Sequence, residues 1–431
     1  MFKFQTDKTF YTVKAENRQF EEALEFINET LRLHYEEQPQ TAVRSLKKVQ
    51  IAGTNGKGST ASMLSSILIK AGYKTGLYTS PSLVCVNERI RMNGRMISDS
   101  ELEGYIPVIS KAQENIGRLF GGFERITAAS MLYYIDNNVD IAIMETGLGG
   151  RYDTVSAVEK LILASITSID MDHMVMLGDT LGQIAREKCG IMRQNVSAVV
   201  HSQKPEAENV INECAQQLNC NLIHTRDVQI ISAKSSDGCE HIIVNANGKQ
   251  YNLNINLEGE YQRENAVNAL LCALELRKLG YNISDNDIEE GIAVSHWEGR
   301  LQKINIDGIK SAVIIDGAHN PHAMKAVADH YITKYGDKKS IVLLSVMADK
   351  DIDGVLDNVA RFANKVVCVA VTERSCKAQQ LAELAKKHNI EAIYADSVAQ
   401  GLKMADELSN GRDFYALGSL YLAGNLLSMT N

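Results

Sequence analysis

The sequence IAGTNGKGST (residues 51–60) places three glycines around one lysine, and it decides how the rest of the chain is interpreted. An apolar segment, KKVQIAG, precedes it, and a second apolar segment, ASMLSSILIKAG, follows it. Glycines allow backbone conformations that are closed to other residues, so several N–H groups can approach one ligand. A helix that begins here would point its free N–H groups and its positive dipole end at the same ligand. The segment therefore predicts a phosphate-binding loop between a strand and a helix.

The side chains of this loop suit a nucleotide. Lys57 adds a positive charge, and Ser59 and Thr60 offer hydroxyls to a phosphate or to magnesium. The spacing differs from the strict G-x-x-x-x-G-K-[ST] loop, because Ile51 stands at the first glycine position and Gly58 follows the lysine. The alternative is an ordinary glycine-rich turn between a strand and a helix.

Length and composition indicate a soluble protein of two or three domains. The chain has 431 residues, of which 45% are hydrophobic and 23% are charged, and its formal net charge is −8. This acidic balance argues against nucleic acid and anionic membranes as partners. We find neither a membrane-length apolar segment nor the core of a signal peptide. The eight cysteines form no C-x-x-C pair, so we expect reduced thiols and a cytoplasmic protein.

Strands and helices alternate after the glycine-rich loop. TGLYTSP (75–81), VDIAIMETG (139–147) and LILASITSID (161–170) are short apolar segments that end in polar or glycine residues, as buried parallel strands do. Helices are expected over 18–36, 180–192 and 261–280, and a further strand in NVSAVVHS. The pattern is that of a parallel α/β domain.

Two further features complete the predicted architecture. The period changes to two near residues 222–258, and EHIIVNANGKQYNLNINLEG (240–259) predicts an antiparallel hairpin that turns at Asn247-Gly248. A second strand and helix alternation begins after SHWEGRLQK (295–303). We therefore expect an α/β protein with two domains: a P-loop-type parallel-sheet ATPase domain with a small antiparallel insertion (1–296), and a Rossmann-like α/β domain (297–431).

Polar side chains follow several of the predicted strands. In open parallel sheets, ligands bind beyond the carboxyl ends of the strands. Because these side chains belong to both domains, a cleft between the domains is the simplest way to bring them together. They are Ser80, Glu145, Asp172, His173, Asp316 and His319.

Taken together, the motifs of this chain resemble those of the Mur ligase superfamily. Within it, the closer resemblance is to folylpolyglutamate synthases and the bifunctional dihydrofolate synthase/folylpolyglutamate synthases. The motifs occur in the family's order over nearly the whole chain. They are AGTNGKGS (52–59), TSP (79–81), NERI (87–90), FE..T (123–127), ETGLGGRYD (145–153), ITSIDMDH (166–173), LG.TL..IAREKCGI (177–191), LEGEYQRENA (257–266), WEGRL (297–301), DGAHNPH (316–322) and GSLYLAG (418–424).

The resemblance implies which residues contact ATP and the pterin or folate. ATP would lie on the glycine-rich loop and on residues of the second half of the chain. The matching ATP positions are Thr54, Asn55, Gly56, Lys57, Gly58, Ser59, Asn265, Arg300, Asp316 and His319. The matching pterin or folate positions are Ser82, Gly122, Phe123, Glu124, Tyr152, Asp153 and Thr154.

Two magnesium ions are expected beside the phosphates. Phosphoryl transfer needs a divalent cation, and Mg²⁺ prefers oxygen ligands, which Glu145 and Ser80 provide. The resemblance implies a second Mg²⁺ near the γ-phosphate, supported by His173 and by Lys188 in carbamylated form. Lys57, Glu145, His173 and Lys188 are then the catalytic residues. We also expect a monovalent cation such as K⁺.

Each of these assignments has a simpler alternative. Glu145 could be a cap or turn residue, His173 a structural histidine, and Lys188 a solvated lysine on a helix. In the second half of the chain, Arg300 could extend over Trp297. Asp316 could cap the helix that begins near Pro321.

The implied reaction is ATP-dependent amide ligation. A substrate carboxylate attacks the γ-phosphate, and the amine of L-glutamate then displaces phosphate from the acyl phosphate. The acid would be dihydropteroate, a reduced folate, or both, and the enzyme would act as a monomer. The alternatives are a Mur-type ligase that joins an amino acid to another carboxylate, and a P-loop ATPase that is not a ligase.

Four positions depart from the pattern of the family, mostly on the folate side. Ser82 and Tyr261 stand where histidine is usual, Ser156 where asparagine is common, and Asp170 where glycine is usual. The ATP and metal positions are intact, so the ligase chemistry is better supported than the identity of the pterin.

Overall fold

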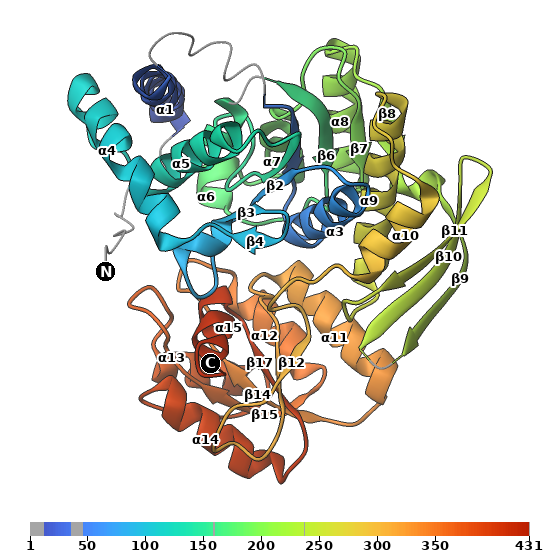
Figure 1. Cartoon of the computed structure of the whole chain (residues 1–431). Helices are drawn as coiled ribbons and strands as arrows, with labels where there is room; N and C mark the ends of the chain where they lie inside the picture. Colours follow the sequence, from blue (N-terminus) through green and yellow to red (C-terminus); the bar gives the residue numbers. More distant parts are fainter. Residues whose placement is uncertain (1–12, 36–45, 158–159, 237, 431) are drawn as a thin grey trace.

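The computed structural model describes residues 13–35, 46–157, 160–236 and 238–430. The strands of these residues form an eight-stranded, a three-stranded and a six-stranded sheet. In Figure 1 the eight-stranded sheet and its helices lie above the six-stranded sheet, and the three-stranded sheet projects at one side. The α/β class with two layered sheets and a small antiparallel insertion is confirmed.

The large sheet holds the glycine-rich loop at its centre. Its strands are parallel except at one edge, where β3 and β4 form an antiparallel pair that the sequence analysis missed. In spatial order they are β4 (Arg95–Met96), β3 (Ile90–Met92), β2 (Thr75–Tyr78), β5 (Ile141–Glu145), β1 (Lys48–Ala52), β6 (Leu161–Ile166), β7 (Ala198–Val200) and β8 (Leu222–His224).

Helices cover both faces of this sheet because its strands are apolar on both sides. In β5, Ile143 packs with the core of one face and Met144 with the core of the other. The first face is covered by α3 (Lys57–Lys70), α9 (Tyr261–Lys278) and α10 (Asp285–Ala293). The second face is covered by α1 (Val13–His34), α4 (Asp99–Ile116), α5 (Gly122–Asp136), α7 (Leu181–Cys189) and α8 (Pro205–Gln217).

The predicted helices agree with the structure to within a few residues. The helix expected over 261–280 is α9, and the one expected over 180–192 is α7, which begins at a capping box formed by Thr180 and Gln183. The helix expected over 18–36 is α1, and position 36 itself lies outside the described residues.

The hairpin predicted at Asn247-Gly248 is present and gains a third strand. β10 (Cys239–Ala246) and β11 (Lys249–Ile255) are joined by this turn, in which both residues have positive φ. Leu253 and Ile255 point into the same core as α9. The third strand, β9 (Gln229–Ser236), has no buried residue, so it carries no alternating pattern that could predict it.

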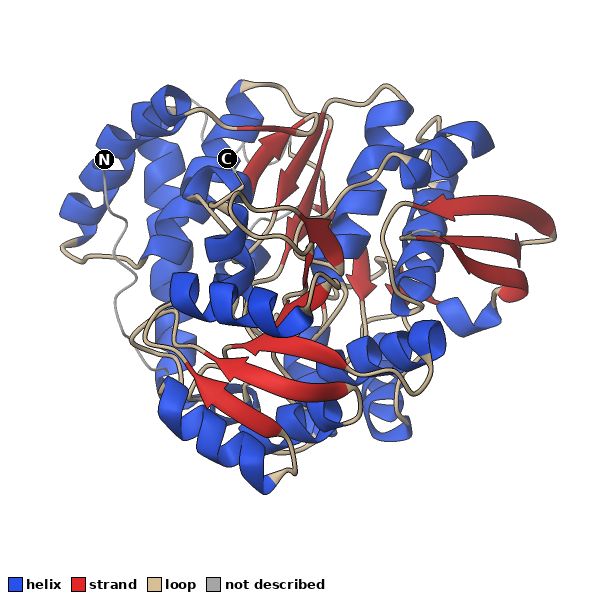
Figure 2. Ribbon diagram, turned by 90° about the horizontal axis from the view of Figure 1, so that it is seen from below, coloured by secondary structure: helices blue, strands red, loops and turns tan. Residues whose placement is uncertain are grey.

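The second sheet has the order β12 (Gln302–Ile304), β13 (Val313–Ile315), β17 (Phe414–Leu417), β14 (Ser340–Leu344), β15 (Ala363–Cys368) and β16 (Glu391–Tyr394). Its strands are parallel apart from β12. Figure 2, seen from below, shows helices on both sides of it. They are α11 (Pro321–Tyr335), α12 (Ile352–Ala360), α13 (Ala378–Lys387), α14 (Val398–Ser409) and α15 (Leu420–Leu427).

Helix α10 ends at Ala293 and β12 begins at Gln302, so we propose to keep the division into 1–296 and 297–431. In the described part of the chain, no helix is both long and apolar enough to cross a membrane.

The close packing of α10 against α3 generates a stability prediction. A Cβ added at Gly291 would lie 2.4 Å from the Cα of Ile67, so alanine forces the two helix backbones apart. We expect Gly291→Ala to lower the free energy of unfolding by about 1–3 kcal/mol. Gly104→Ala is the control, because its site on α4 is open and alanine is the better helix former by about 0.5–1 kcal/mol. Urea unfolding of both variants measures the difference. A free energy of unfolding that is the same in Gly291→Ala as in the wild type would contradict this packing.

Candidate active site

A cavity of about 530 Å³ lies between the carboxyl edge of the large sheet and residues 297–431, which we call the second half of the chain. Every residue predicted to bind ATP or metal lines it, from both halves of the sequence. They are Thr54, Asn55, Gly56, Lys57, Gly58, Ser59, Ser80, Glu145, His173, Lys188, Asn265, Arg300, Asp316 and His319. The geometry thus brings the predicted set together at one cavity.

The glycines of the loop are required by crowding as well as by backbone conformation. Gly56 has φ +88°, and a Cβ there would lie 2.4 Å from Oδ1 of Asn265 on α9. A Cβ at Gly58 would lie 2.6 Å from Nε1 of Trp297. The loop is therefore enclosed by α9 and by the only tryptophan of the chain, which the sequence pattern could not show.

Lys57 is folded over its own loop. Its Nζ donates hydrogen bonds to the carbonyl oxygens of Gly53 (3.1 Å) and Thr54 (3.2 Å), and it lies 4.0 Å from Oε1 of Glu145. An ammonium group held at this point places its charge where the loop N–H groups converge. The arrangement suits a phosphate group.

Glu145 ends β5 and is buried, with 5% of its surface exposed. Its Oε2 accepts a hydrogen bond from the backbone N–H of Ser80 at 3.2 Å, so its carboxylate fixes the turn that carries the Ser80 hydroxyl. Burial raises the pKa of Glu145, while the charge of Lys57 and the bond from Ser80 oppose this rise. A buried carboxylate with one cation 4.0 Å away can accept a divalent cation.

Lys188 is buried, and the interpretation of it as a solvated helix lysine is wrong. Only 5% of its surface is exposed, and its Nζ donates to the carbonyl oxygen of Gly53 at 2.9 Å. Burial, and then the nearby charge of Lys57, lower the pKa of Lys188 to about 7. A large fraction of this amine is therefore neutral near pH 7, which is the form that reacts with carbon dioxide.

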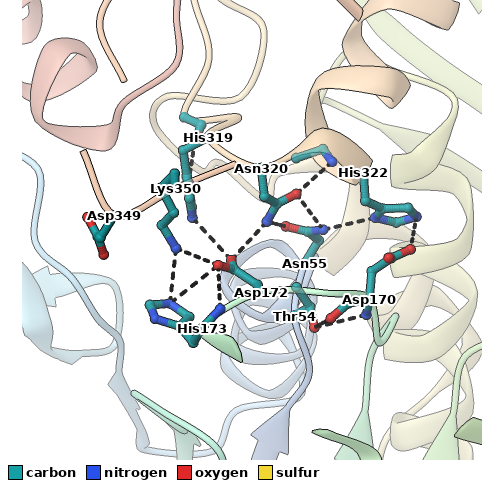
Figure 3. A network of polar contacts seen from close by, with 12 residues as sticks. Thr54, Asn55, Asp170, Asp172, His173, His319, Asn320, His322, Asp349 and Lys350 are labelled. Carbon is teal, nitrogen blue, oxygen red and sulfur yellow. Dashed lines mark hydrogen bonds and ion pairs between the residues drawn. The ribbon is translucent and has the colours of Figure 1, made fainter. Parts of the chain in front are cut away.

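Asp172 joins the two halves of the chain at the same edge of the cavity (Figure 3). Its carboxylate accepts hydrogen bonds from Nζ of Lys350 (2.5 Å) and Nδ2 of Asn320 (3.0 Å), and it lies 3.7 Å from Nε2 of His319. Burial alone would raise its pKa, but His319, His173 and Lys350 hold the pKa of Asp172 well below its usual range. Asp172 is therefore a permanent anion that binds three groups of the second half.

His173 follows Asp172 and faces the same cluster. Burial, and then the charge of Lys350 with Nζ 3.3 Å from its Nε2, lower the pKa of His173 to about 4. The imidazole is thus neutral at physiological pH, as a metal ligand must be. Lys350 was not among the predicted site residues. The signal for it was present, because Asp349 and Lys350 directly follow the strand segment SIVLLSVMA.

Asn320 makes a second link between the halves. Its Nδ2 donates to Oδ1 of Asn55 (3.2 Å), and Nδ2 of Asn55 lies 2.9 Å from Nδ1 of His322. The same Asn320 caps α11, since its Oδ1 accepts from the N–H of Ala323 (2.8 Å).

The interpretation of Asp316 as the cap of α11 is therefore wrong. Its carboxylate accepts from the N–H groups of Leu301 (2.9 Å) and Ala318 (2.7 Å) and from the hydroxyl of Tyr261 (3.2 Å). Tyr261, one of the departures from the family pattern, thus bonds directly to a predicted ATP residue.

A second cavity of about 220 Å³ adjoins the first. The walls of the two cavities share Gly147, Leu148, Gly149 and Leu177. Five predicted pterin residues line it: Phe123, Glu124, Tyr152, Asp153 and Thr154. Two others, Ser82 and Gly122, are not among the described residues of its wall. Phe20 of α1, which the prediction lacked, lies against Tyr152 with ring centroids 6.1 Å apart.

Two residues of this region form hydrogen bonds within the fold that the sequence did not predict. The carboxylate of Asp153 accepts from the N–H groups of Gly147 (3.0 Å), Leu148 (2.9 Å) and Val155 (2.9 Å), and burial raises its pKa to about 6. Ser156, a second departure from the pattern, donates to the carbonyl of Gly150 at 2.6 Å. Both residues hold the loop that separates the two cavities.

The donor set suits magnesium only together with phosphate oxygens. Across the described residues, no group of three or more His, Cys, Asp or Glu side chains could hold a metal by itself. Glu145, the Ser80 hydroxyl and neutral His173 would supply some of the ligands, and a nucleotide would supply the rest. Mg²⁺ commonly binds in this way, through one or two carboxylates, waters and substrate phosphates.

Comparison with known proteins gives this geometry a family. The Mur ligase middle domain matches residues 51–273, and the Mur ligase glutamate ligase domain matches residues 299–419. The dihydrofolate synthase/folylpolyglutamate synthase of Bacillus subtilis is 33% identical over 331 residues, which are 75% of this chain and 76% of that protein. The protein of the same name from Escherichia coli is 33% identical over 351 residues, 81% of this chain and 78% of that one.

Solved structures agree with the sequence matches. Mycobacterium tuberculosis folylpolyglutamate synthase, complexed with ADP and AMPPCP, superposes with a TM-score of 0.86 at 26% identity and covers 97% of this chain and 99% of its own. E. coli FolC in complex with DHPP and ADP gives a TM-score of 0.80 at 28% identity, over 94% and 92% of the two chains. The chain therefore belongs to the Mur ligase family and, within it, to the dihydrofolate synthase/folylpolyglutamate synthases, which are ATP-dependent ligases.

Proposed function

We propose that this enzyme joins L-glutamate in amide linkage to a pterin-bearing acid, either dihydropteroate, a reduced folate, or both, with ATP as the activating substrate. One observation carries the proposal. The wall formed by Gly147, Leu148 and Gly149 belongs both to the cavity of the glycine-rich loop and to a second cavity with aromatic walls. Glu145 lies just before this wall, so a γ-phosphate and the carboxylate of a bound acid would meet beside it.

The second cavity suits a flat heteroaromatic acid. Phe123 and Tyr152 offer ring surfaces, and Glu124 offers hydrogen-bond acceptors to the N–H groups of a pterin. The E. coli relative was solved with DHPP and ADP bound, which supports a pterin compound here. A nucleotide-hydrolysing module that acts on no acid would leave this cavity without a use.

Residues of the first cavity would offset the negative charge that builds up when the substrate carboxylate attacks the γ-phosphate. A carboxylate anion that approaches a triphosphate is repelled, so the reaction needs cations that are already in place. Lys57 and Arg300 face this point, and Mg²⁺ on Glu145, Ser80 and the phosphates would neutralise the oxygens of the transferred group. A second Mg²⁺ would use His173 and the carbamate of Lys188.

The second half of the chain closes the site. Asp172–Lys350 and Asn55–Asn320 hold it against the glycine-rich loop, which keeps water away from an acyl phosphate. Displacement by the amine of glutamate then gives the amide and inorganic phosphate. A monovalent cation and a monomeric state remain predictions.

The direct test is phosphate release over a panel of acids and amino acids. We expect release only when ATP, L-glutamate and either dihydropteroate or a reduced folate are all present, with unequal efficiency for the two acids. Release without any acid would favour a simple ATPase. Release with a different carboxylate, and with neither pterin, would favour another Mur-type ligase.

Glu145→Gln tests the metal role. Glutamine keeps the carbonyl that accepts from Ser80 but removes the charge that would hold magnesium. We expect turnover to fall by at least about a hundredfold, roughly 3 kcal/mol of barrier, with the thermal unfolding temperature nearly unchanged. Steady-state kinetics against Mg²⁺ concentration measures this effect. Turnover within about threefold of wild type, less than roughly 1 kcal/mol, would remove Glu145 from metal binding.

Lys188→Ala tests the carbamate. We expect most of the activity to be lost and partly restored by acetate, because a small carboxylate can replace the missing anion. Lys57→Ala is the matched control, since acetate cannot replace a cation. Carbon-13 NMR of wild-type enzyme in labelled bicarbonate should show a carbamate signal that Lys188→Ala lacks. An unmodified lysine under these conditions would disprove the modification.

A further inference from the structure

We propose that Glu264 recognises the 6-amino group of the purine base and so makes the enzyme prefer ATP to 6-oxopurine nucleotides. The inference rests on the proposed function only in that the large cavity binds a nucleotide. Neither the glycine-rich loop nor the family motifs assign a residue to the base.

The strand order places the base on the β7 side of the loop. The glycine-rich loop follows β1, and Glu145 ends the neighbouring β5 on one side. On the other side come β6 and β7, and His201 and Ser202 directly follow β7. Strands lie about 4.8 Å apart, so β7 is roughly 10 Å from β1. With the γ-phosphate beside Glu145, a nucleotide would extend its base toward His201 and Ser202.

Glu264 lies at this end and is held as a hydrogen-bond acceptor. It occupies the first turn of α9, next to Asn265, and lines the cavity together with His201 and Ser202. Its Oε1 accepts from the N–H of Ser202 and from Oγ1 of Thr225, both at 2.7 Å. Its Oε2 lies 3.9 Å from Nδ1 of His201, and 38% of the side chain is exposed. One oxygen therefore fixes the carboxylate and the other is available to a ligand.

The charge states of Glu264 and His201 favour a hydrogen-bond donor on the base. Burial alone would raise the pKa of Glu264, but the neighbouring His201, and then the hydrogen bonds from Thr225 and Ser202, bring it below the usual value, so the carboxylate is ionised. His201 lies 3.9 Å from Oε2, and burial lowers its pKa to about 4, so the ring is neutral and does not cancel the charge. An ionised carboxylate only accepts, so it favours an amino group and disfavours a carbonyl oxygen.

Part of the wall that α11 contributes is small and apolar. Ala323, Ala326 and Val327 of α11 line the same cavity and have no polar side-chain atoms. Such a wall leaves room for a flat ring and gives it an apolar surface to lie against. Glu264 then supplies an ionised acceptor for the polar edge of the base.

Binding of ATP and of ITP, measured by isothermal titration without pterin and glutamate, tests the proposal. ITP carries an oxygen in place of the 6-amino group and a hydrogen on N1, and purine riboside triphosphate, which has neither, separates the two differences. We expect wild-type enzyme to bind ATP at least about tenfold more tightly than ITP, which is the usual size of a lost hydrogen bond to a charged group.

Glu264→Gln should reduce that preference at least about tenfold, because its amide can keep the bond from Ser202 and donate to a 6-oxo group. Glu260→Gln is the matched control. It removes the same charge near the start of α9 at an exposed position outside the cavity wall, so the ratio should stay at the wild-type value.

Three results would overturn the proposal. If Glu264→Gln lowered the affinities for ATP and ITP equally, the carboxylate would serve only to hold Ser202 and Thr225. If wild-type enzyme bound 2′-deoxy-ATP or 3′-deoxy-ATP more weakly than ATP, and Glu264→Gln bound them equally, the carboxylate would be assigned to the ribose. Wild-type affinities for ATP and ITP within twofold of each other would show that the 6-position is not recognised.

The proposal remains testable if Glu264→Gln does not fold. Wild-type enzyme should then discriminate against purine riboside triphosphate and N6,N6-dimethyl-ATP as it does against ITP, and equal binding of all four nucleotides would contradict the role. Selective ATP binding without glutamate-dependent phosphate release would disprove the proposed ligase function and leave this inference standing.

Discussion

The carbonyl oxygen of Gly53 accepts hydrogen bonds from two lysines, and the rest of the site is arranged around this contact. Lys57 donates to it at 3.1 Å and Lys188 at 2.9 Å. Two ammonium groups on one buried oxygen repel each other, which is one reason why the pKa of Lys188 is lowered to about 7. The repulsion is relieved if one amine becomes a carbamate anion or if a polyphosphate binds beside the other. The loop is thus organised for an anion.

The second constraint is the packing that holds this loop in place. Gly56 and Gly58 lack side chains because Asn265 and Trp297 occupy that space. Helix α9, which carries Asn265, is packed in the core that also contains α3 and the three-stranded sheet. Asn320 and Lys350 bring the second half of the chain onto the same edge through Asp172. A disturbance at any of these contacts would change the distance between the nucleotide and the residues that close over it.

Much of the fold followed from local patterns. The glycine-rich loop, the strand that ends at Glu145 and the turn at Asn247-Gly248 each carry a signal within a few residues, and the structure contains all three. β9 could not be predicted, because its residues are exposed and do not alternate. The antiparallel pair of β3 and β4 was also missed. These strands have only three and two residues, too few to show a period.

The site was predictable as a set of residues but not as a set of contacts. A pattern cannot show that Lys188 is buried, that Asp153 bonds to three N–H groups, or that Asn320 rather than Asp316 caps α11. These facts depend on segments that are far apart in the sequence. Glu264 is a similar case, since its importance appears only when Ser202 and Thr225 are seen to hold one of its oxygens.

The central claim is that the carboxylate of a bound acid is phosphorylated by ATP before the amide forms. Transfer of oxygen-18 tests it most directly. A pterin acid labelled in both carboxylate oxygens is incubated with enzyme, ATP and L-glutamate, and the inorganic phosphate is analysed by mass spectrometry. The mechanism predicts one labelled oxygen in the phosphate for each amide formed. Amide formation with unlabelled phosphate would contradict an acyl phosphate and the account of the site that is built on it.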